Sequence, residues 1–401
     1  MRMGLSKFQI MLILQGVLLA GLAIADAAVE NNIERSFQVA SGGRLTVDSD
    51  RGSIEVRTAD HDQVDVKIER KVKRGGKWSV EEVLEDFAIT FDHGDNGVTI
   101  SAKYDRLNLR RWSRERNRLR VKFLITVPQR YNVDLKTSGG GVSVEDLEGE
   151  VRSQTSGGSL RFGNIKGPVW GRTSGGSIKL EGTQGDADVT TSGGGITIGS
   201  VEGAVESTTS GGSIRIDGVT GSVNAKTSGG SITAEEVMGS INAKTSGGGI
   251  TIGNVEGAVE AIISGGSIRI DRAGSVNAKT SGGSITVEEV MGNINAKTTG
   301  GSIKAYISGQ PEGDCSLETT GGNVTAYVVE DIAVNVDAKT TGGRVSSDIP
   351  VTTVVQGKIN KNELQGAING GGPLLKLRTY GGSIRLRKKP MVEDGTLTEG
   401  L

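Results

Sequence analysis

The chain is poor in the residues that build disulfide frameworks and many metal sites. Its 401 residues include one cysteine and two histidines, which excludes a disulfide framework and leaves little for a zinc-type site. Only six prolines occur and no Gly-X-Y period is present, so collagen is excluded. Aromatic residues are scarce, at 3%. The net charge of −1 and the apolar content of 35% argue against disorder. Glycine, by contrast, is abundant, with 63 residues.

The first 27 residues have the pattern of an export signal. Basic residues precede a mainly apolar stretch at 8–25, and Ala25-Asp26-Ala27 supplies the small residues that a signal peptidase reads. We expect cleavage near residue 27 and export to the periplasm, outer envelope or medium, with no transmembrane segment after cleavage. An uncleaved anchor is the alternative, although the stretch is short for a membrane span and contains glutamines.

A short motif returns along most of the chain. From Thr137 onward Thr-Ser-Gly-Gly, or a close variant, recurs in steps of 18 residues as far as Ser264, and then in steps of 17, 18 and 21. A fixed period of this size is typical of a solenoid, in which each unit contacts mainly its neighbours. Within a unit apolar and polar residues alternate, as at 214–217, which predicts strands.

These observations predict an all-β chain. We expect a single-stranded parallel β-helix of about 18 residues per coil, right-handed by general precedent, with about twelve coils stacked ~4.8 Å apart. The glycines would form corners where φ can be positive. The threonines that precede the motif would point inward and hydrogen-bond along the stack, starting with Thr155, Thr173, Thr191 and Thr209.

A longer repeat is superimposed on the short one. Residues 193–245 recur almost unchanged as 247–298, with one residue missing near Ala273. Three coils have therefore been duplicated as a block. The duplicated surface offers the same side chains twice, which suits a structural rod or a multivalent binder better than a single active site.

The sequence divides into five parts. In the second, strand-like runs occur at 44–48, 53–58, 63–71, 98–103 and 119–126, and Ser79-Val80-Glu81-Glu82 resembles a capping box that opens a short helix as far as Phe87. This part would cover the edge that a bare solenoid exposes. The parts are a signal peptide at 1–27, a β-rich cap at 28–135, regular coils at 136–349, terminal coils at 350–388 and a flexible tail at 389–401.

Three further segments accompany the repeated motif and carry a family resemblance. They are Val121–Pro128 (VKFLITVP), Tyr131–Gly140 (YNVDLKTSGG) and Gly370–Leu386 (GGGPLLKLRTYGGSIRL). With these segments the chain resembles the bacterial putative-adhesin family, a domain of unknown function made of β-strand repeats, over about residues 36–388. The resemblance implies a parallel β-helix and an exported or cell-envelope location. It brings no catalytic residues with it.

The densest positive charge lies in one short segment, which could bind anions or glycans. The candidate residues are Arg106, Arg110, Arg111, Trp112, Arg114, Arg116, Arg118 and Arg120. The alternative, which the neutral net charge favours, is a solvated hairpin loop balanced by Glu81, Glu82, Glu85 and Asp86. Possible partners are an envelope glycan, an anionic polysaccharide, a surface protein or a second copy of the chain. Nucleic acid is not expected.

Acidic residues on neighbouring coils form a second candidate. The 18-residue step places Asp217 beside Glu235, and the duplicate places Asp271 beside Glu288. Such pairs could bind calcium or act as an acid and a base, but a solvated surface of mixed charge is favoured.

Little else in the sequence suggests catalysis. His61 and His93 lie in aspartate-rich turns and are expected to be exposed there. We expect no metal, no cofactor and no enzymatic activity. The predicted function is an exported binding protein that presents a repetitive rigid surface. The alternatives are a self-associating, bactofilin-like scaffold and a carbohydrate-active enzyme.

Overall fold

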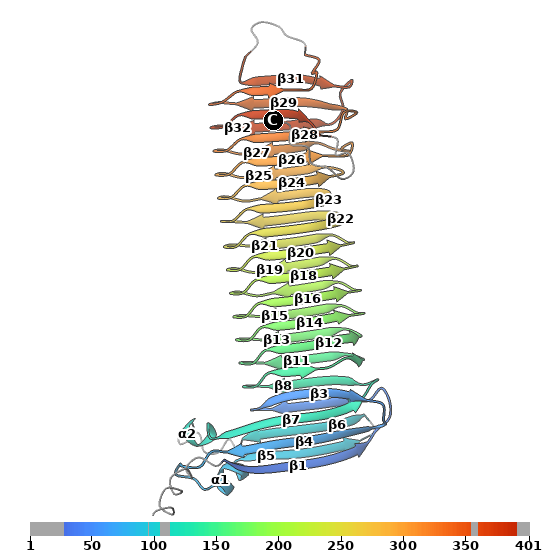
Figure 1. Cartoon of the computed structure of the whole chain (residues 1–401), viewed down its shortest axis with the longest axis vertical. Coiled ribbons are helices and arrows are strands. Elements are labelled where there is room, and N and C mark those ends of the chain that lie inside the picture. The colour runs from blue at the N-terminus through green and yellow to red at the C-terminus, as the bar shows by residue number, and fades with distance from the viewer. Residues whose placement is uncertain (1–27, 95, 105–112, 354–359, 391–401) are drawn as a thin grey trace, which may run out of the picture.

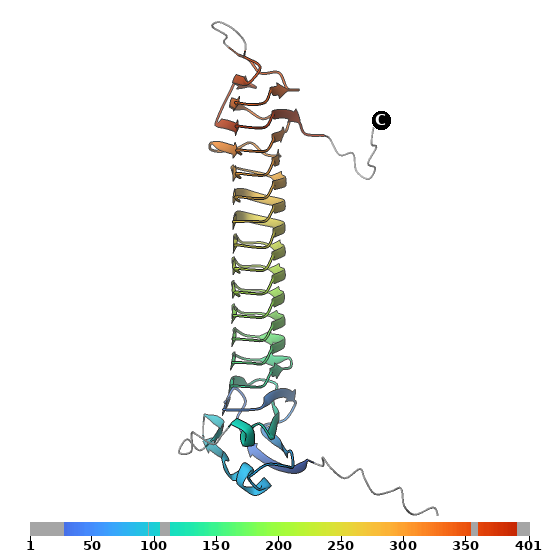
Figure 2. The ribbon, with the colours of Figure 1, turned by 90° about the vertical axis from the view of Figure 1, so that its left-hand side faces the viewer.

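The chain forms a long rod of stacked coils with a wider N-terminal end (Figure 1). The computed structural model describes residues 28–94, 96–104, 113–353 and 360–390. In this part of the chain only α1 (Val80–Glu85) and α2 (Ser113–Arg116) are helical, and the strands belong to one continuous hydrogen-bonded system. Viewed from the side, the coils repeat at even spacing along the rod (Figure 2). The expected all-β parallel β-helix is therefore confirmed.

Each regular coil contributes one strand to each of two long sheets. The first sheet contains β9 (Val142–Val144), β12 (Leu160–Lys166), β14 (Ile178–Thr183), β16 (Ile196–Val201), β18 (Ile214–Val219), β20 (Ile232–Val237), β24 (Ile285–Val290), β26 (Ile303–Ile307) and β28 (Val324–Val328). The second contains β8 (Asn132–Thr137), β11 (Val151–Thr155), β13 (Val169–Thr173), β15 (Ala187–Thr191), β17 (Val205–Thr208), β19 (Val223–Lys226), β21 (Ile241–Thr245), β25 (Ile294–Lys297) and β27 (Cys315–Glu318). β22 (Ile250–Ile263) and β23 (Ile268–Lys279) continue from one sheet into the other, and β10 (Leu147–Glu148) is a short strand at the corner between them.

The alternation of apolar and polar residues decides which side chains fill the rod. Ile196 pairs with Ile214 and Ile214 with Ile232, so identical positions stack directly above one another. These isoleucines are almost completely buried, whereas Arg215, the residue after Ile214, is exposed. Because the interior between the two sheets is narrow, the core is built mainly from Ile, Val, Leu, Ala and Thr.

The repeated glycine pair is explained by space rather than by backbone conformation. A Cβ atom on Gly158 would lie 2.1 Å from the carbonyl oxygen of Gly140 one coil below, and Gly176 and Gly194 meet the same obstacle. The expectation of positive φ at these corners is wrong, because none of the Thr-Ser-Gly-Gly glycines in the regular coils lies in the left-handed region. The second glycine of the motif is needed because its backbone packs directly against the backbone of the coil below, which leaves no room for a side chain.

The buried threonines support the same corner. The Thr155 hydroxyl donates to the carbonyl of Gly140 at 2.7 Å, and the Thr173 hydroxyl donates to Gly158 at 2.7 Å. The threonines were expected to point inward and bond along the stack. They do so, but through the glycine carbonyl of the preceding coil rather than through one another. Each motif is therefore hydrogen-bonded to the one below it.

At the N-terminal end the coils are interleaved out of sequence order. β2 (Arg44–Ser49) and β3 (Ser53–Ala59) form one coil, which lies between β8/β9 above it and β6 (Gly97–Tyr104) and β7 (Leu119–Pro128) below it. β4 (Gln63–Val72) then pairs antiparallel with β7, β1 (Val29–Gln38) with β4, and β5 (Phe87–Gly94) with β6. Stacking thus begins at Arg44 and extends into the segment expected to be a separate cap.

The C-terminal end is interleaved in the same way. β32 (Leu374–Thr379) and β33 (Ile384–Lys388) stack directly on β27 and β28, although β29 (Val334–Thr340) and β30 (Val345–Ser347) come earlier in the sequence. β29 and β30 lie on the far side of this inserted coil. The antiparallel strand β31 (Glu363–Ile368) then covers the edge of β29. Antiparallel strands therefore end both sheets at the N-terminal end, whereas at the C-terminal end β31 covers one sheet and the other ends in β30, which is parallel to β33.

Candidate binding surface

The arginine-rich segment is only partly described by the structure. Arg106, Arg110, Arg111 and Trp112 lie outside the described residues, and Arg114 belongs to α2. Arg120 is exposed on β7, opposite Lys71 of β4. A binding role for these residues stays a prediction.

Arg116 and Arg118 are held by partners inside the cap. Arg116 Nε lies 2.9 Å from Asp86, and its guanidinium group covers the ring of Tyr104 at 3.8 Å. Arg118 is buried, bonds Glu115 at 2.6 Å and donates to two backbone carbonyls. Backbone hydrogen bonds, followed by Arg118, hold the pKa of Glu115 below its ordinary value. These two arginines fasten α2 to the cap, and Asp86 is one of the acidic partners expected to balance the segment.

The acidic pairs on neighbouring coils are each bridged by an arginine. Arg215 contacts both Asp217, at 3.0 Å, and Glu235. In the duplicate block Arg269 contacts Asp271 at 3.0 Å and Glu288 at 3.3 Å. The predicted adjacency is correct, and the carboxylates are neutralised by a cation of the chain itself. This arrangement is typical of a solvated surface of mixed charge.

The two histidines do not form a common site. His61 lies 3.4 Å from Asp65, whereas a ring nitrogen of His93 lies 2.8 Å from the carbonyl oxygen of Gln38. Within the described ranges no cluster of three or more His, Cys, Asp or Glu side chains could hold a metal ion. In that same part of the chain no helix has the length and apolar character needed to cross a membrane.

A shallow trough with a volume of 460 Å³ runs along the second sheet over the duplicated coils. Buried strand residues such as Ile241 and Val259 lie beneath it. Its polar lining consists of hydroxyl, amide and carboxylate groups, including those of Ser240, Asn242, Glu260, Asn277, Asn295 and Asp314. Asn224 stacks in register on Asn242, and Asn277 on Asn295, while Glu260 of β22 stands between the two pairs in the same column.

Three amides of this column are incompletely hydrogen-bonded. The side-chain oxygens of Asn224, Asn242 and Asn277 are buried and have no hydrogen-bond partner among the described residues. Asn224 donates through Nδ2 to Glu206 at 2.7 Å. Leaving a buried acceptor unpaired costs about 1–3 kcal/mol. A half-turn of the amide exchanges its oxygen and nitrogen and would present the oxygen to a hydroxyl donor lying in the trough.

A column of lysines borders the asparagines. Lys226 pairs in register with Lys244, and Lys279 pairs with Lys297. Like charges placed directly opposite each other in a sheet are destabilising. Acidic neighbours relieve part of this charge, as with Glu260 at 3.3 Å from Lys244, but Lys279 has no acidic partner in the described part of the chain.

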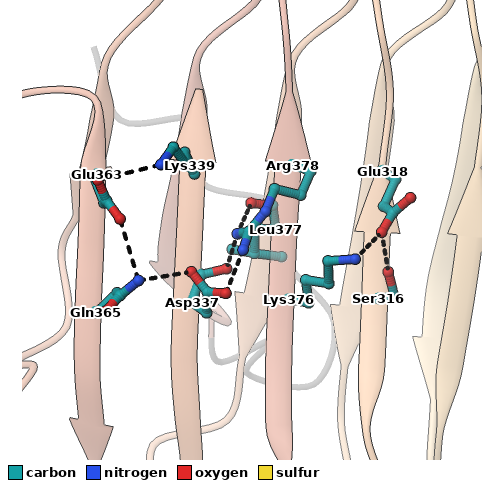
Figure 3. Close-up of polar contacts among 9 residues, drawn as sticks. All are labelled: Ser316, Glu318, Asp337, Lys339, Glu363, Gln365, Lys376, Leu377 and Arg378. Atoms are coloured by element: carbon teal, nitrogen blue, oxygen red, sulfur yellow. Dashed lines mark hydrogen bonds and ion pairs between the residues drawn. The ribbon is translucent and has the colours of Figure 1, made fainter. Parts of the chain in front are cut away.

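The coils beyond the duplicated block carry a ladder of ion pairs and hydrogen bonds. On β27, β32, β29 and β31 these contacts run across neighbouring strands (Figure 3), although Lys339 and Arg378 stand directly opposite each other. Lys376 contacts Glu318 at 2.6 Å and holds the pKa of the Glu318 carboxyl group below its ordinary value. Arg378 contacts Asp337 in the same ladder. In the duplicated coils Lys226, Lys244 and Lys297 also have acidic partners, at 3.3 to 3.9 Å, so Lys279 is the lysine whose charge an anionic ligand would balance.

The family of the chain follows from sequence. The model of the family described as Toastrack DUF4097 matches residues 43–273 and again 223–387. The chain belongs to the Toastrack DUF4097 family. The two overlapping matches together span the stacked coils from β2 to β33, interleaved ends included. This agrees with the resemblance stated above. No curated protein matches the chain in sequence.

Several solved structures are similar to this chain at low sequence identity. A putative adhesin from Bacteroides fragilis is 20% identical, with a TM-score of 0.38, and covers 55% of this chain and 97% of its own. A putative cell adhesion protein from Clostridium sporogenes is 11% identical, with a TM-score of 0.18, and covers 90% and 100%. A putative lipid binding protein from Parabacteroides distasonis is 15% identical, with a TM-score of 0.20, and covers 74% and 93%. At these scores the family assignment depends on the sequence match.

Sequence reasoning missed the trough, although a signal for it was present. The segment Val/Ile-Asn-Ala-Lys-Thr occurs four times, and its Asn and Lys fall on outward positions of the predicted strands. Stacking the units in steps of one coil would have placed the four asparagines and the four lysines in two columns. The arginine segment attracted attention instead because its charges are adjacent in the sequence.

Proposed function

We propose that the protein is an exported, non-enzymatic, adhesin-like rod whose trough binds an anionic glycan of the cell envelope. The observation that carries the proposal is the pair of columns formed by asparagines and lysines on the second sheet of the duplicated coils. Their amides offer both donors and acceptors to hydroxyl groups, and their ammonium groups offer positive charge to carboxylates or sulfates.

The geometry suits a chain-like ligand better than a small one. The trough is open along the rod, and Asn and Lys recur together on two adjacent coils of each block, ~4.8 Å apart, with Glu260 and Ile262 on the coil between the two pairs. A linear polymer lying along the axis could therefore make the same contact on both coils of each pair. Because the contacts are exposed and individually weak, affinity would come from repetition.

The duplication supports this interpretation. Asn224 and Lys226 in the first block correspond to Asn277 and Lys279 in the second, at equivalent positions of β19 and β23. Two copies on one rigid support raise the effective concentration of the second contact. The exported location is supported by the signal-like first 27 residues and by the adhesins named among the similar structures.

A binding experiment on residues 28–401 tests the proposal. Polygalacturonate and heparin serve as anionic probes, and dextran as a neutral one, with titrations at low and at physiological salt. We expect the anionic probes to bind, and their affinity to fall as the salt concentration rises, because salt screens exposed charge pairs. The double variant Lys244→Gln/Lys297→Gln should bind about tenfold more weakly, the sum of two exposed charge contacts.

A matched variant controls for net charge. Arg215→Gln/Arg269→Gln also removes two positive charges from the duplicated block, but on the first sheet, away from the trough. It should bind the anionic probes as the unmodified protein does. Equal loss of binding in both double variants, or equal binding of dextran, would contradict a trough site.

The self-associating scaffold is the second candidate, and the ends of the rod argue against it. A filament needs parallel edges that match the next subunit at both ends of the rod, whereas β1 and β5 end the sheets in antiparallel pairing at one end and β31 covers β29 in antiparallel pairing at the other. Sedimentation of residues 28–401 should therefore show no concentration-dependent filaments.

A further inference from the structure

A second longitudinal hollow lies at the corner where the strands of the first sheet end. Two adjoining depressions of 340 and 670 Å³ share Ser200 and Glu202 and form one continuous channel, here called the corner groove. It extends from Gln129 in the first regular coil to Met291 in the second duplicated block. A row of glycines that includes Gly221 separates the corner groove from the trough.

The corner groove is acidic with an apolar floor. Val201, Val219 and Val237 form its base in successive coils. Carboxylates line its walls, namely those of Asp146, Glu148, Glu202, Glu236 and Glu256. Its two basic residues are already engaged, since Lys166 lies 2.6 Å from Glu148 and Arg272 lies 3.7 Å from Glu289. The charge left over is negative.

Two methionines on the rim of the corner groove are exposed to solvent. Met238 is 60% exposed and Met291 is 43% exposed, and they are two of the three large apolar side chains exposed in the described part of the chain. Both also line the corner groove. Exposed apolar groups beside a hollow mark interaction sites, and methionine adapts well to varied partners.

The middle of the corner groove carries a defined order of groups. Glu202, Thr220, Met238 and Glu256 occupy the same corner position in four successive coils. The carboxylates of Glu202 and Glu256 have no hydrogen-bond or ion-pair partner within the described residues. Two free anionic groups therefore stand three coils apart, ~14 Å, with an exposed apolar side chain between them.

We propose that the corner groove binds an extended cationic peptide segment of a partner protein, with basic residues at positions i and i+4 and an apolar residue at i+2. In an extended strand residues i and i+4 point to the same side and lie ~13 Å apart, which matches the separation of Glu202 and Glu256. The residue at i+2 then lies ~6.6 Å from i, between the levels of Thr220 at ~4.8 Å and Met238 at ~9.6 Å, and within side-chain reach of Met238. Charge complementarity selects the cationic peptide over an anionic glycan, and the length of the corner groove selects an extended chain over a folded domain.

This partner is distinct from the ligand of the trough. Lysines stand beside the trough on the same strands, although its own lining includes Glu260 and Asp314, whereas five carboxylates line the corner groove, so we expect ligands of opposite charge on either side of the glycine row. The two sites can therefore be tested independently on the same protein.

The test is a titration of fluorescent peptides against residues 28–401. The probe carries Lys-x-Leu-x-Lys between neutral flanks. One comparison peptide changes the spacing to Lys-Leu-x-Lys. The other keeps the spacing of the probe and replaces both lysines with glutamine. We expect the first peptide to bind at least fivefold more tightly than either comparison peptide. Glu202→Gln/Glu256→Gln should weaken it about tenfold and Met238→Ser about threefold.

The double variant Asp60→Asn/Asp62→Asn is the matched control, because it removes two negative charges from an exposed turn of the cap. It should bind the first peptide as the unmodified protein does. The proposal is overturned if the three peptides bind equally, if the two double variants weaken binding equally, or if no peptide binds. Sedimentation alone and with peptide adds a further check. If the protein self-associates, and if both the peptide and Glu202→Gln/Glu256→Gln abolish that association, the corner groove binds a second copy of the chain. That result would also overturn the proposal.

Discussion

Replacing one glycine of the repeated motif tests the reason for the repeat. In Gly212→Ala the new Cβ atom would lie 2.2 Å from the carbonyl oxygen of Gly194 and 2.4 Å from its carbonyl carbon, where ordinary contacts begin at 3.4 Å. The coils must separate locally by more than an ångström, since both clashing atoms belong to the backbone. Such overpacking costs about 1–3 kcal/mol. Loss of a neighbouring inter-coil hydrogen bond, such as that from Gly211 N to Ser192 O, adds about 0.5–1.5 kcal/mol.

We therefore expect Gly212→Ala to lower the free energy of unfolding by about 2–4 kcal/mol. The same coil offers a control, because a Cβ atom on Gly218 would meet only the Ser200 hydroxyl, at 4.0 Å. Gly218→Ala should be neutral or stabilising by up to about 1 kcal/mol, since alanine restricts the unfolded chain.

Guanidinium unfolding followed by circular dichroism measures both glycine variants. Hydrogen exchange adds a local readout, because a solenoid can open coil by coil. Amides near Gly194, Gly212 and Gly230 should lose protection in Gly212→Ala and keep it in Gly218→Ala. If the two variants unfold at the same denaturant concentration, close backbone contact is not what requires the second glycine.

Two further perturbations test the corner threonine and the surface ion pairs. Thr209→Val removes the hydroxyl that donates to the carbonyl of Gly194 at 2.8 Å and should lower the free energy of unfolding by about 1–2 kcal/mol. Thr208→Val, on the outer face, should leave it unchanged. Equal unfolding midpoints for the two variants would refute the role of the Thr209 hydroxyl. Hydrogen bonds from Lys166 and Lys376 hold the carboxyl pKa of Glu148 and Glu318 below the ordinary 4.5, so their stabilisation is present above pH 4.5 and is lost as the pH falls through the lowered values. Melting temperatures from pH 7 to pH 3 should therefore fall on the acid side of this range, and an unchanged melting temperature would show that these pairs add nothing.

Much of the cap was predictable from local patterns. The expected strand runs agree with β2, β3, β4, β6 and β7 to within two residues at each end. The capping box at Ser79 is present, with Ser79 N donating to Glu82 at 2.6 Å and Glu82 N donating to the Ser79 hydroxyl at 3.1 Å. The helix ends at Glu85, however, because Phe87 already begins β5.

Two strands of the cap were missed for a physical reason. In β1 the apolar residues Val29, Ile33 and Phe37 stand four positions apart, and every position of the strand is at least partly exposed. In β5 only Phe87 is buried. Edge strands bury so little surface that the two-residue alternation is weak in their sequence, and their identity comes from the partners β4 and β6.

The order of the terminal coils was not predictable from the repeat. The motif at Tyr380-Gly381-Gly382 resembles the others, yet its coil lies between two coils that precede it in the sequence. Every coil of this family of strands can stack on every other, because the corner contact is the same backbone contact each time. The inserted coil is joined to its neighbours by long-range contacts that the repeat does not encode, such as those of Arg378 with Asp337 and of Lys376 with Glu318.

The duplication shows how such a rod can acquire a surface without disturbing its core. The residue missing near Ala273 shifts the register only between Val255 and Ala258, at the corner, where β22 and β23 run on without a break. Beyond the corner Val259 pairs with Val276 and Glu260 with Asn277, so the column that lines the trough continues in register. A copied block of whole coils keeps its inward residues stacked and repeats its outward ones, because each coil contacts mainly its neighbours. Both the trough and the corner groove extend over coils of both blocks, which means that the same event lengthened two surfaces of the rod.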